Sequence, residues 1–293
     1  MGRDIAETHD AARRVFDEAD RILQIPLSRI CFEGPADRLN ATDISQPAIF
    51  VTSVAMWRVM AEKGIAADLA PAAMAGLSLG EYTALHLAGW IDFEVCLRLV
   101  ARRGQLMQSA AENTSGGMVS IMNLSEEQTV ALCREAAQGE PLGPANYNCP
   151  GQIVISGARG ACHRAVDLAE KYGGRGVPLV VAGAFHSPLM ESAAAGLSEP
   201  LTKATLKVSQ IPVVSNVSAD YHGDPDSVRL RLREQVAQPI RWEASMRKLI
   251  ADGFSRFVEV GPGRVLSGLM RKIDRSVKML NFSSAATLDQ PLN

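Results

Sequence analysis

The stretch from residue 74 to residue 81 constrains the fold of this chain more than any other, because it places a serine on a sharp turn. Its centre is a Gly-x-Ser-x-Gly sequence with Ser78 in the middle. The apolar run over 69–75 has the length of a buried strand, and residues 81–88 are predicted to form a helix. Strand, Gly-x-Ser-x-Gly and helix are the context of a nucleophile elbow, in which both glycines are expected to allow a close backbone approach. We therefore predict that Ser78 is an exposed nucleophile facing the N–H groups of the following helix.

The rest of the chain alternates between helical periodicity and short apolar runs, which predicts a mainly parallel sheet covered by helices. Residues 116–182 differ, because they follow the order strand-helix-strand-strand-helix-strand that is typical of ferredoxin-like domains. We expect a large α/β domain made of 1–115 and 183–293, with 116–182 inserted as a small ferredoxin-like domain. The individual elements expected include a helix over 5–23 and strands over 69–75, 118–122, 152–156, 177–181, 211–215, 256–260 and 277–282.

Composition excludes several classes of function. With 293 residues, 47% hydrophobic and 21% charged, the chain has enough apolar side chains for a sizeable core. Its net charge of −2 gives no reason to expect a nucleic-acid partner. The five cysteines form no Cys-x-x-Cys pair, which indicates reduced thiols in a cytoplasm rather than disulfides or a zinc site. No apolar run approaches the length of a membrane span, and the first residues are not typical of a signal peptide.

A serine nucleophile needs a base, and His186 is the best placed of the five histidines. It lies in a loop of small residues, 183–188, between an expected strand end and a helix start, where active sites of open α/β sheets occur. The alternatives are less suitable, since two lie on polar helix faces, one lies in the elbow helix and one lies in a polar turn: His9, His163, His86 and His222. No acidic residue occupies an obvious position to orient His186. A backbone carbonyl can do this instead.

Several motifs occur together and in a fixed order along the chain: Gly76-Leu77-Ser78-Leu79-Gly80-Glu81-Tyr82, Arg103-Gly104-x-x-Met107-Gln108, Asn146-x-Asn148-x-Pro150-Gly151-Gln152, Phe185-His186-Ser187 and Glu259-Val260-Gly261-Pro262-Gly263. Together they resemble the malonyl-CoA:acyl carrier protein transacylases and cover nearly the whole chain. The resemblance implies an α/β-hydrolase-like domain carrying a ferredoxin-like subdomain. It also implies transfer of malonyl from malonyl-CoA to the phosphopantetheine thiol of acyl carrier protein through an acyl-serine. We expect a cytoplasmic monomer without a cofactor or metal of its own, because coenzyme A and phosphopantetheine are substrates.

The resemblance also implies a role for individual residues. Ser78 resembles the nucleophile and His186 its base, while Arg103 resembles the arginine that pairs with the malonyl carboxylate. The N–H of Leu79 is expected to donate to the oxyanion, and the carbonyl of Arg241 to orient the histidine. The remaining expected site residues are Leu77 beside the nucleophile, Phe185 as a selector against an α-methyl group, and the pocket-shaping Asn146 and Asn216.

Two other interpretations remain open from the residues alone. One is a serine esterase similar to lysophospholipases, although such an enzyme has no use for a buried cation at Arg103. The other is a truncated, inactive chain that only binds carrier protein. The second arises because the family begins with a strand and a Gly-Gln-Gly loop that supplies another oxyanion donor, and no Gly-Gln-Gly occurs in this sequence. We therefore expect Met1 to be an internal methionine of the natural protein.

Overall fold

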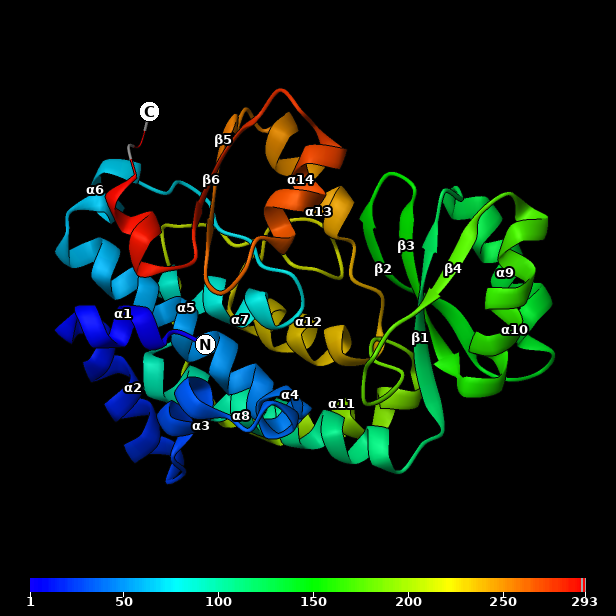
Figure 1. The fold of residues 1–293 in the computed structure, drawn as a ribbon, viewed down its shortest axis with the longest axis horizontal. Helices are drawn as coiled ribbons and strands as arrows, with labels where there is room; N and C mark the ends of the chain where they lie inside the picture. The colour runs from blue at the N-terminus through cyan, green and yellow to red at the C-terminus, as the bar shows by residue number, and fades with distance from the viewer. Residues whose placement is uncertain (291, 293) are drawn as a thin grey trace. The chain divides into compact units, whose positions relative to one another are not determined.

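The computed structural model describes residues 1–290 and 292, and the chain divides into two compact units (Figure 1). Unit 1 consists of Met1–Gly104, Ala204–Val214 and Ile250–Asn293, and unit 2 of Gln105–Lys203 and Ser215–Leu249. Helix α8 (Phe93–Glu112) contributes residues to both. No helix among the described residues is both long and apolar enough to span a membrane.

Unit 1 is built around α5 (Thr42–Glu62), a nearly all-round apolar helix whose middle is fully buried. An all-round apolar helix belongs in a core rather than on a surface, and its neighbours accordingly cover it: α1 (Arg3–Thr8), α2 (Asp10–Leu23), α3 (Leu27–Glu33), α4 (Ala36–Asn40), α6 (Ile65–Leu69) and α7 (Leu79–Leu87).

The prediction of a single helix over 5–23 is wrong, because this stretch forms two helices, α1 and α2. The chain breaks at His9, whose extended backbone (φ −136°, ψ 118°) ends α1 and begins α2. The break allows the start of α1 to fold back against α2, so closely that a Cβ on Gly2 would lie 2.8 Å from the Phe16 ring. Periodicity alone does not reveal this bend, because the apolar spacing continues through it.

The strands of unit 1 pair in parallel. β5 (Arg256–Val260) and β6 (Lys278–Phe282) pair with Val258 opposite Leu280, and α14 (Val265–Ile273) connects them, as Figure 1 shows. The strands expected over 69–75 and 211–215 are reduced to one parallel bridge, between Met74 and Val213. Both stretches contain a proline, which has no N–H to extend a ladder. The prediction of an α/β fold with parallel pairing is confirmed, but the strands predicted over 69–75 and 211–215 were too long.

Unit 2 contains a four-stranded antiparallel sheet in the order β2-β3-β1-β4 (Figure 1). Its elements follow the order strand-helix-strand-strand-helix-strand: β1 (Gly116–Met122), α9 (Glu126–Ala137), β2 (Leu142–Cys149), β3 (Gln152–Ala158), α10 (Arg159–Ala169) and β4 (Arg175–Pro178). One face of the sheet packs on the two helices around Ile121, Ile155, Leu132 and Ala165, all fully buried. The short helix η1 (Glu170–Tyr172) leads into β4.

The last strand of this sheet begins before the expected 177–181 and ends at Pro178. Gly176 explains the difference, because a Cβ there would lie 2.9 Å from the Cα of Val166. The close approach of β4 to α10 therefore occurs at a glycine, which an apolar pattern does not register, while Val180 of the apolar run is exposed.

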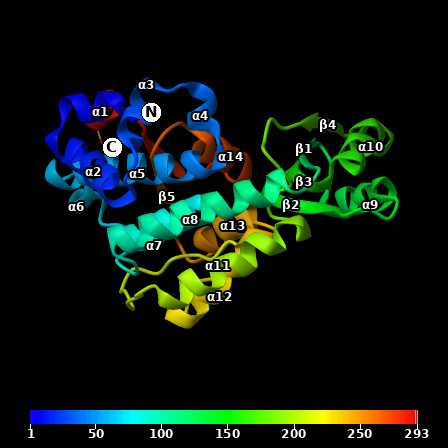
Figure 2. The ribbon, with the colours of Figure 1, turned by 90° about the horizontal axis from the view of Figure 1, so that it is seen from below.

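The remaining helices of unit 2 include α11 (Glu191–Lys203) and α12 (Pro225–Ala237), which pack side by side in Figure 2. The short helix η2 (Pro188–Met190) precedes α11, and α13 (Trp242–Ala251) follows α12. A parallel bridge between Asn146 and Ile240 joins the β2 strand to the segment before α13. The helix η3 (Ala285–Asp289) belongs to unit 1.

Candidate active site

Ser78 occupies a strained turn directly before α7. Its backbone has φ 51° and ψ −107°, a conformation that L-residues rarely adopt and that clusters at functional sites. Leu79 is the first residue of α7, so its N–H has no acceptor within the helix. The turn thus presents a hydroxyl beside peptide donors, which is the arrangement of a nucleophile with an oxyanion site.

The two glycines of the elbow have different roles. A Cβ on Gly76 would lie 2.0 Å from the carbonyl carbon and oxygen of Gly80, so the backbone before the serine touches the backbone of the helix. A Cβ on Gly80 would meet none of the described atoms within 4 Å outside its chain neighbours and the backbone of its own helix. The expectation that both glycines are sterically required is therefore wrong for Gly80.

This difference gives a matched pair of substitutions. Gly76→Ala should destabilise the protein by about 1–3 kcal/mol, the cost of overpacking, because both partners of the clash are backbone atoms. Gly80→Ala should leave stability unchanged or raise it slightly, since alanine favours the first turn of α7 more than glycine does. Chemical denaturation of both variants measures the difference. Equal losses would show that the close contact at Gly76 does not matter.

Arg103 on α8 reaches the nucleophile. Its Nη2 donates to Ser78 Oγ at 2.9 Å and its Nη1 donates to Gln46 Oε1 at 2.6 Å. The guanidinium carbon lies 5.5 Å from the centre of the Tyr82 ring. Only 1% of Arg103 is exposed, and burial lowers its pKa while Tyr82 and Glu81 act in the opposite direction. An arginine remains charged in such surroundings, so the turn contains a buried cation in contact with a hydroxyl.

The backbone of α8 approaches α5 closely beside this arginine. A Cβ on Gly104 would lie 2.9 Å from the carbonyl oxygen of Thr42 and 3.1 Å from Asp43 Cα. This approach brings Gln46, one turn further along α5, against Arg103. Gln46 was missed by sequence reasoning, because it is one of several polar residues in the first turns of α5 and nothing in the sequence distinguishes it.

His186 in unit 2 is buried, with 5% of its surface exposed, and its backbone φ is 57°. Its Nδ1 lies 2.7 Å from the carbonyl oxygen of Gln235 on α12. A carbonyl accepts only, so Nδ1 carries the proton and Nε2 is the basic nitrogen. The next residue, Ser187, supports the turn by donating to Ala184 O at 2.6 Å and accepting from Leu189 N at 3.3 Å.

The carbonyl that orients the His186 ring is therefore that of Gln235. The prediction that the carbonyl of Arg241 has this role is wrong. The carbonyl oxygen of Arg241 accepts from Ser245 N and Ser245 Oγ, each at 2.9 Å, at the start of α13. The fully buried Asn216 joins the two positions, because its backbone oxygen accepts from Arg241 N and its side chain faces Gln235 Nε2 at 3.4 Å. The expectation of a backbone orienter was right in kind and wrong in position.

The other expected site residues lie in separate places. Phe185 packs against the buried Met118, Ala145 and Val154 of the four-stranded sheet. Asn146 is a buried residue of β2, whereas the side chain of Arg241 is exposed and lies over the Tyr147 ring at 5.7 Å. Leu77 and Leu79 flank Ser78, with Leu79 buried. The structure thus brings Arg103 to Ser78 within unit 1 and Gln235 to His186 within unit 2.

His86 has no place in this chemistry, as the sequence indicated. It is half-buried on α7 and contacts the rings of Phe50 and Phe93, with ring centroids 5.7 and 5.6 Å away, and its Nδ1 lies 2.9 Å from Ile91 O. Burial lowers its pKa, and the hydrogen bond to Ile91 opposes this only in part.

The unfolding free energy should consequently depend on pH through His86. Its folded pKa lies below the unfolded value of about 6.5, so the unfolded chain binds more protons in this window and stability falls as pH drops below about 6.5. His86→Asn keeps a donor toward Ile91 and removes the titration, so its stability should fall less between pH 7 and pH 5. His163→Gln, at an exposed position, should behave like the wild type. An unchanged profile in His86→Asn would exclude this source of pH dependence.

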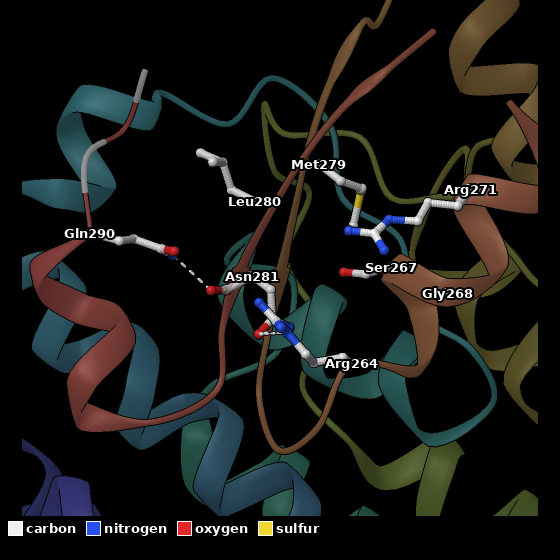
Figure 3. A pocket seen from close by; sticks show the side chains of 8 residues that line it. All are labelled: Arg264, Ser267, Gly268, Arg271, Met279, Leu280, Asn281 and Gln290. Atoms are coloured by element: carbon white, nitrogen blue, oxygen red, sulfur yellow. Dashed lines mark hydrogen bonds between the residues drawn. The ribbon is translucent and has the colours of Figure 1, made fainter. Parts of the chain in front are cut away.

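A separate pocket of about 160 Å³ lies between α14 and β6 (Figure 3). It is lined by Arg264, Ser267, Gly268, Arg271, Met279, Leu280, Asn281 and Gln290. None of these belongs to the elbow or the histidine turn, and the Gln290 side chain donates to Asn281 O at 2.7 Å at the edge of the pocket. Among the described residues no group of histidine, cysteine and acidic side chains is arranged to hold a metal ion.

Comparisons with known proteins find relatives that cover nearly the whole chain. The model of the family described as acyl transferase domain matches residues 1–289. The chain is 41% identical to malonyl CoA-acyl carrier protein transacylase of Bacillus subtilis (strain 168), over 99% of this chain and 90% of that protein. It is similar to the crystal structure of an acyl carrier protein S-malonyltransferase from Vibrio cholerae, with 39% identity, a TM-score of 0.93 and coverage of 99% and 94%. It is also similar to a malonyl-transacylase solved in complex with its type II PKS acyl-carrier protein, with 38% identity, a TM-score of 0.93 and coverage of 97% and 92%.

Proposed function

Because the chain belongs to the acyl transferase domain family, we propose that it transfers a malonyl group from malonyl-CoA to the phosphopantetheine thiol of an acyl carrier protein. The observation that carries this proposal is the 2.9 Å contact between Arg103 Nη2 and Ser78 Oγ. A hydrolase of neutral esters has no use for a buried cation on its nucleophile. An acyl group that ends in a carboxylate has one.

The short contact also favours an acyl group of malonyl length. In malonyl-CoA a single methylene separates the carboxylate from the thioester carbonyl. A carboxylate bound to the fork of Arg103 therefore keeps the carbonyl carbon close to Ser78 Oγ, and bidentate pairing suits the planar guanidinium. A longer diacid would place its thioester carbonyl beyond the serine.

The proposed reaction has two half-reactions. Ser78 Oγ attacks the thioester carbonyl and its proton passes to His186 Nε2, while the N–H of Leu79 donates to the developing oxyanion. The carbon–sulfur bond breaks, coenzyme A leaves with the proton from His186, and malonyl-Ser78 remains. The carrier thiol then gives its proton to His186 and attacks the ester, and Ser78 recovers its proton as it leaves. Gln235 O keeps the imidazole in the required tautomer throughout.

We also propose that residues 116–182 form a ferredoxin-like domain, inserted in an α/β-hydrolase-like domain made of 1–115 and 183–293. The antiparallel order β2-β3-β1-β4 and the helices on one face support the first assignment. All five cysteines, which lie in the described part of the chain, are buried free thiols, in keeping with a cytoplasmic protein. We further propose that it acts as a monomer without a metal or cofactor of its own, that Phe185 and Asn146 shape the acyl pocket, and that Leu77 flanks the nucleophile.

Intact-mass spectrometry tests this function directly. After brief incubation with malonyl-CoA the protein should gain the mass of one malonyl group, located on Ser78 by peptide mapping. Addition of carrier protein bearing phosphopantetheine should discharge it with appearance of malonyl-carrier. Rapid release of free malonate without any thiol acceptor would instead identify an esterase, and the absence of an adduct would contradict the proposal.

A further inference from the structure

Arg103 is held by two neutral groups whose hydrogen bonds point in different directions. The Gln46 amide accepts from Nη1 and the Ser78 hydroxyl accepts from Nη2. The shorter of the two contacts, 2.6 Å, is the one to Gln46, and 6% of the Gln46 residue is exposed. A planar guanidinium held at one amino group cannot rotate without losing that bond, so Gln46 determines where the other amino group points.

The helix that carries Gln46 is itself fixed at both sides of this residue. On one side the Gly104 backbone of α8 rests on Thr42 and Asp43, and Arg38 holds Asp43 through paired contacts of 3.0 and 2.9 Å. On the other side Gly261 approaches so closely that a Cβ there would lie 2.3 Å from Ser53 Oγ.

The buried carboxylate of Glu259 holds the turn that contains Gly261. Glu259 accepts from Leu266 N at 2.9 Å, Ser267 N at 3.0 Å and Asn281 Nδ2 at 3.1 Å, which ties the start of α14 to both strands of the parallel pair. The motif over residues 259–263 therefore packs on α5 through Gly261. In this way it supports the helix that carries Gln46.

We propose that Gln46 is the positioning residue for Arg103 and thereby sets the preference of Ser78 for acyl groups that end in a carboxylate. This inference rests on the proposed function. An amide is suited to the task because it orients the guanidinium without adding a negative charge that would compete with the substrate. Removal of the acceptor leaves Nη1 without this bond, and the fork then turns away from the position in which it meets the carboxylate.

Single-turnover acylation of Ser78 by malonyl-CoA and by acetyl-CoA, followed by intact mass, tests the inference. Gln46→Met retains length and loses the acceptor, whereas Gln46→Glu retains the acceptor and adds a charge. Each should lower the second-order rate constant for acylation by malonyl-CoA by about 10- to 100-fold, the effect of a lost or altered hydrogen bond to a charged group. The acetyl rate constant should change less than about 3-fold, because acetyl makes no use of Arg103. For Gln46→Glu the loss should appear chiefly as a raised KM for malonyl-CoA, since the introduced carboxylate competes with that of the substrate.

Thr52→Val is the matched control, because Thr52 lies on the same helix with 2% of its surface exposed and its Oγ1 has no hydrogen-bond partner among the described residues. It should keep the malonyl-to-acetyl ratio of the wild type. A ratio unchanged in both Gln46 variants, or equally shifted in Thr52→Val, would overturn the inference while wild-type malonylation stands. Failure of the wild type to accept malonyl at all would refute the proposed function instead. If Gln46→Met melts well below the wild type, Gln46→Asn decides the question, because it keeps the amide but is one methylene shorter and withdraws the acceptor from Nη1.

Discussion

Ser78→Ala should abolish the acyl-enzyme and lower malonyl transfer by about 10⁶-fold, the loss typical of a nucleophile that works together with a base. Alanine has no oxygen to attack the thioester, and the N–H of Leu79 and the Arg103 fork can then only bind the substrate. The measurements are steady-state transfer to carrier protein and intact mass after incubation with malonyl-CoA. Thermal melting of the variant shows whether the turn survives, because alanine must also adopt φ 51° there.

His186→Ala should lose nearly as much, and the double variant should lose little more than either single one. Non-additivity of this kind is the signature of two groups that act in one step. Ser276→Ala, at an exposed position outside the elbow, is the control for a serine without a catalytic role and should transfer at the wild-type rate. Normal transfer by Ser78→Ala would refute the assignment of the nucleophile. Multiplicative losses in the double variant would refute the assignment of His186 as its base.

Ser78, Arg103 and His186 could be proposed as site residues from the sequence because each belongs to a motif with a chemical reason. The Gly-x-Ser-x-Gly sequence around Ser78 and the Arg103-Gly104 pair can be recognised directly in the amino-acid sequence. The orienting group of His186 was misplaced by six residues, at Arg241 instead of Gln235, because every residue carries a carbonyl and only the path of the chain decides which one faces the ring. Gln46 was missed for a similar reason, since its function depends on how closely α8 crosses α5 at Gly104.

The fold was predictable to the same extent. Apolar runs predicted β1, β3, β5 and β6 within about two residues, because buried strands need such runs. The same runs overpredicted strands around Met74 and Val213, where prolines limit the pairing to a single bridge. Close backbone approaches at Gly2, Gly76 and Gly176 could not be foreseen, because a glycine in a sequence does not state which backbone it touches.

Arg103→Ala should separate malonyl from acetyl transfer. Without the guanidinium the substrate carboxylate is left unpaired in the site, at a cost of about 2–5 kcal/mol. This cost corresponds to a loss of at least about 30-fold in kcat/KM for malonyl-CoA. Acetyl-CoA has no carboxylate to leave unpaired, so its transfer should persist or improve as the buried cation is removed. Arg103→Lys should lie between the two, since a lysine keeps the charge and loses the fork.

The adjacent Arg102 makes the control unusually close. It is exposed on the same turn of α8, so Arg102→Ala removes one positive charge from the same helix without touching Ser78 or Gln46. If the general field of the helix attracts malonyl-CoA, both alanine variants should weaken malonyl transfer to a similar degree, and added salt should reduce the difference. If the contact at Ser78 is what matters, only Arg103→Ala should change the malonyl-to-acetyl ratio, at any salt concentration. Equal losses of malonyl and acetyl transfer in Arg103→Ala would mean that the arginine holds the turn together and does not read the substrate.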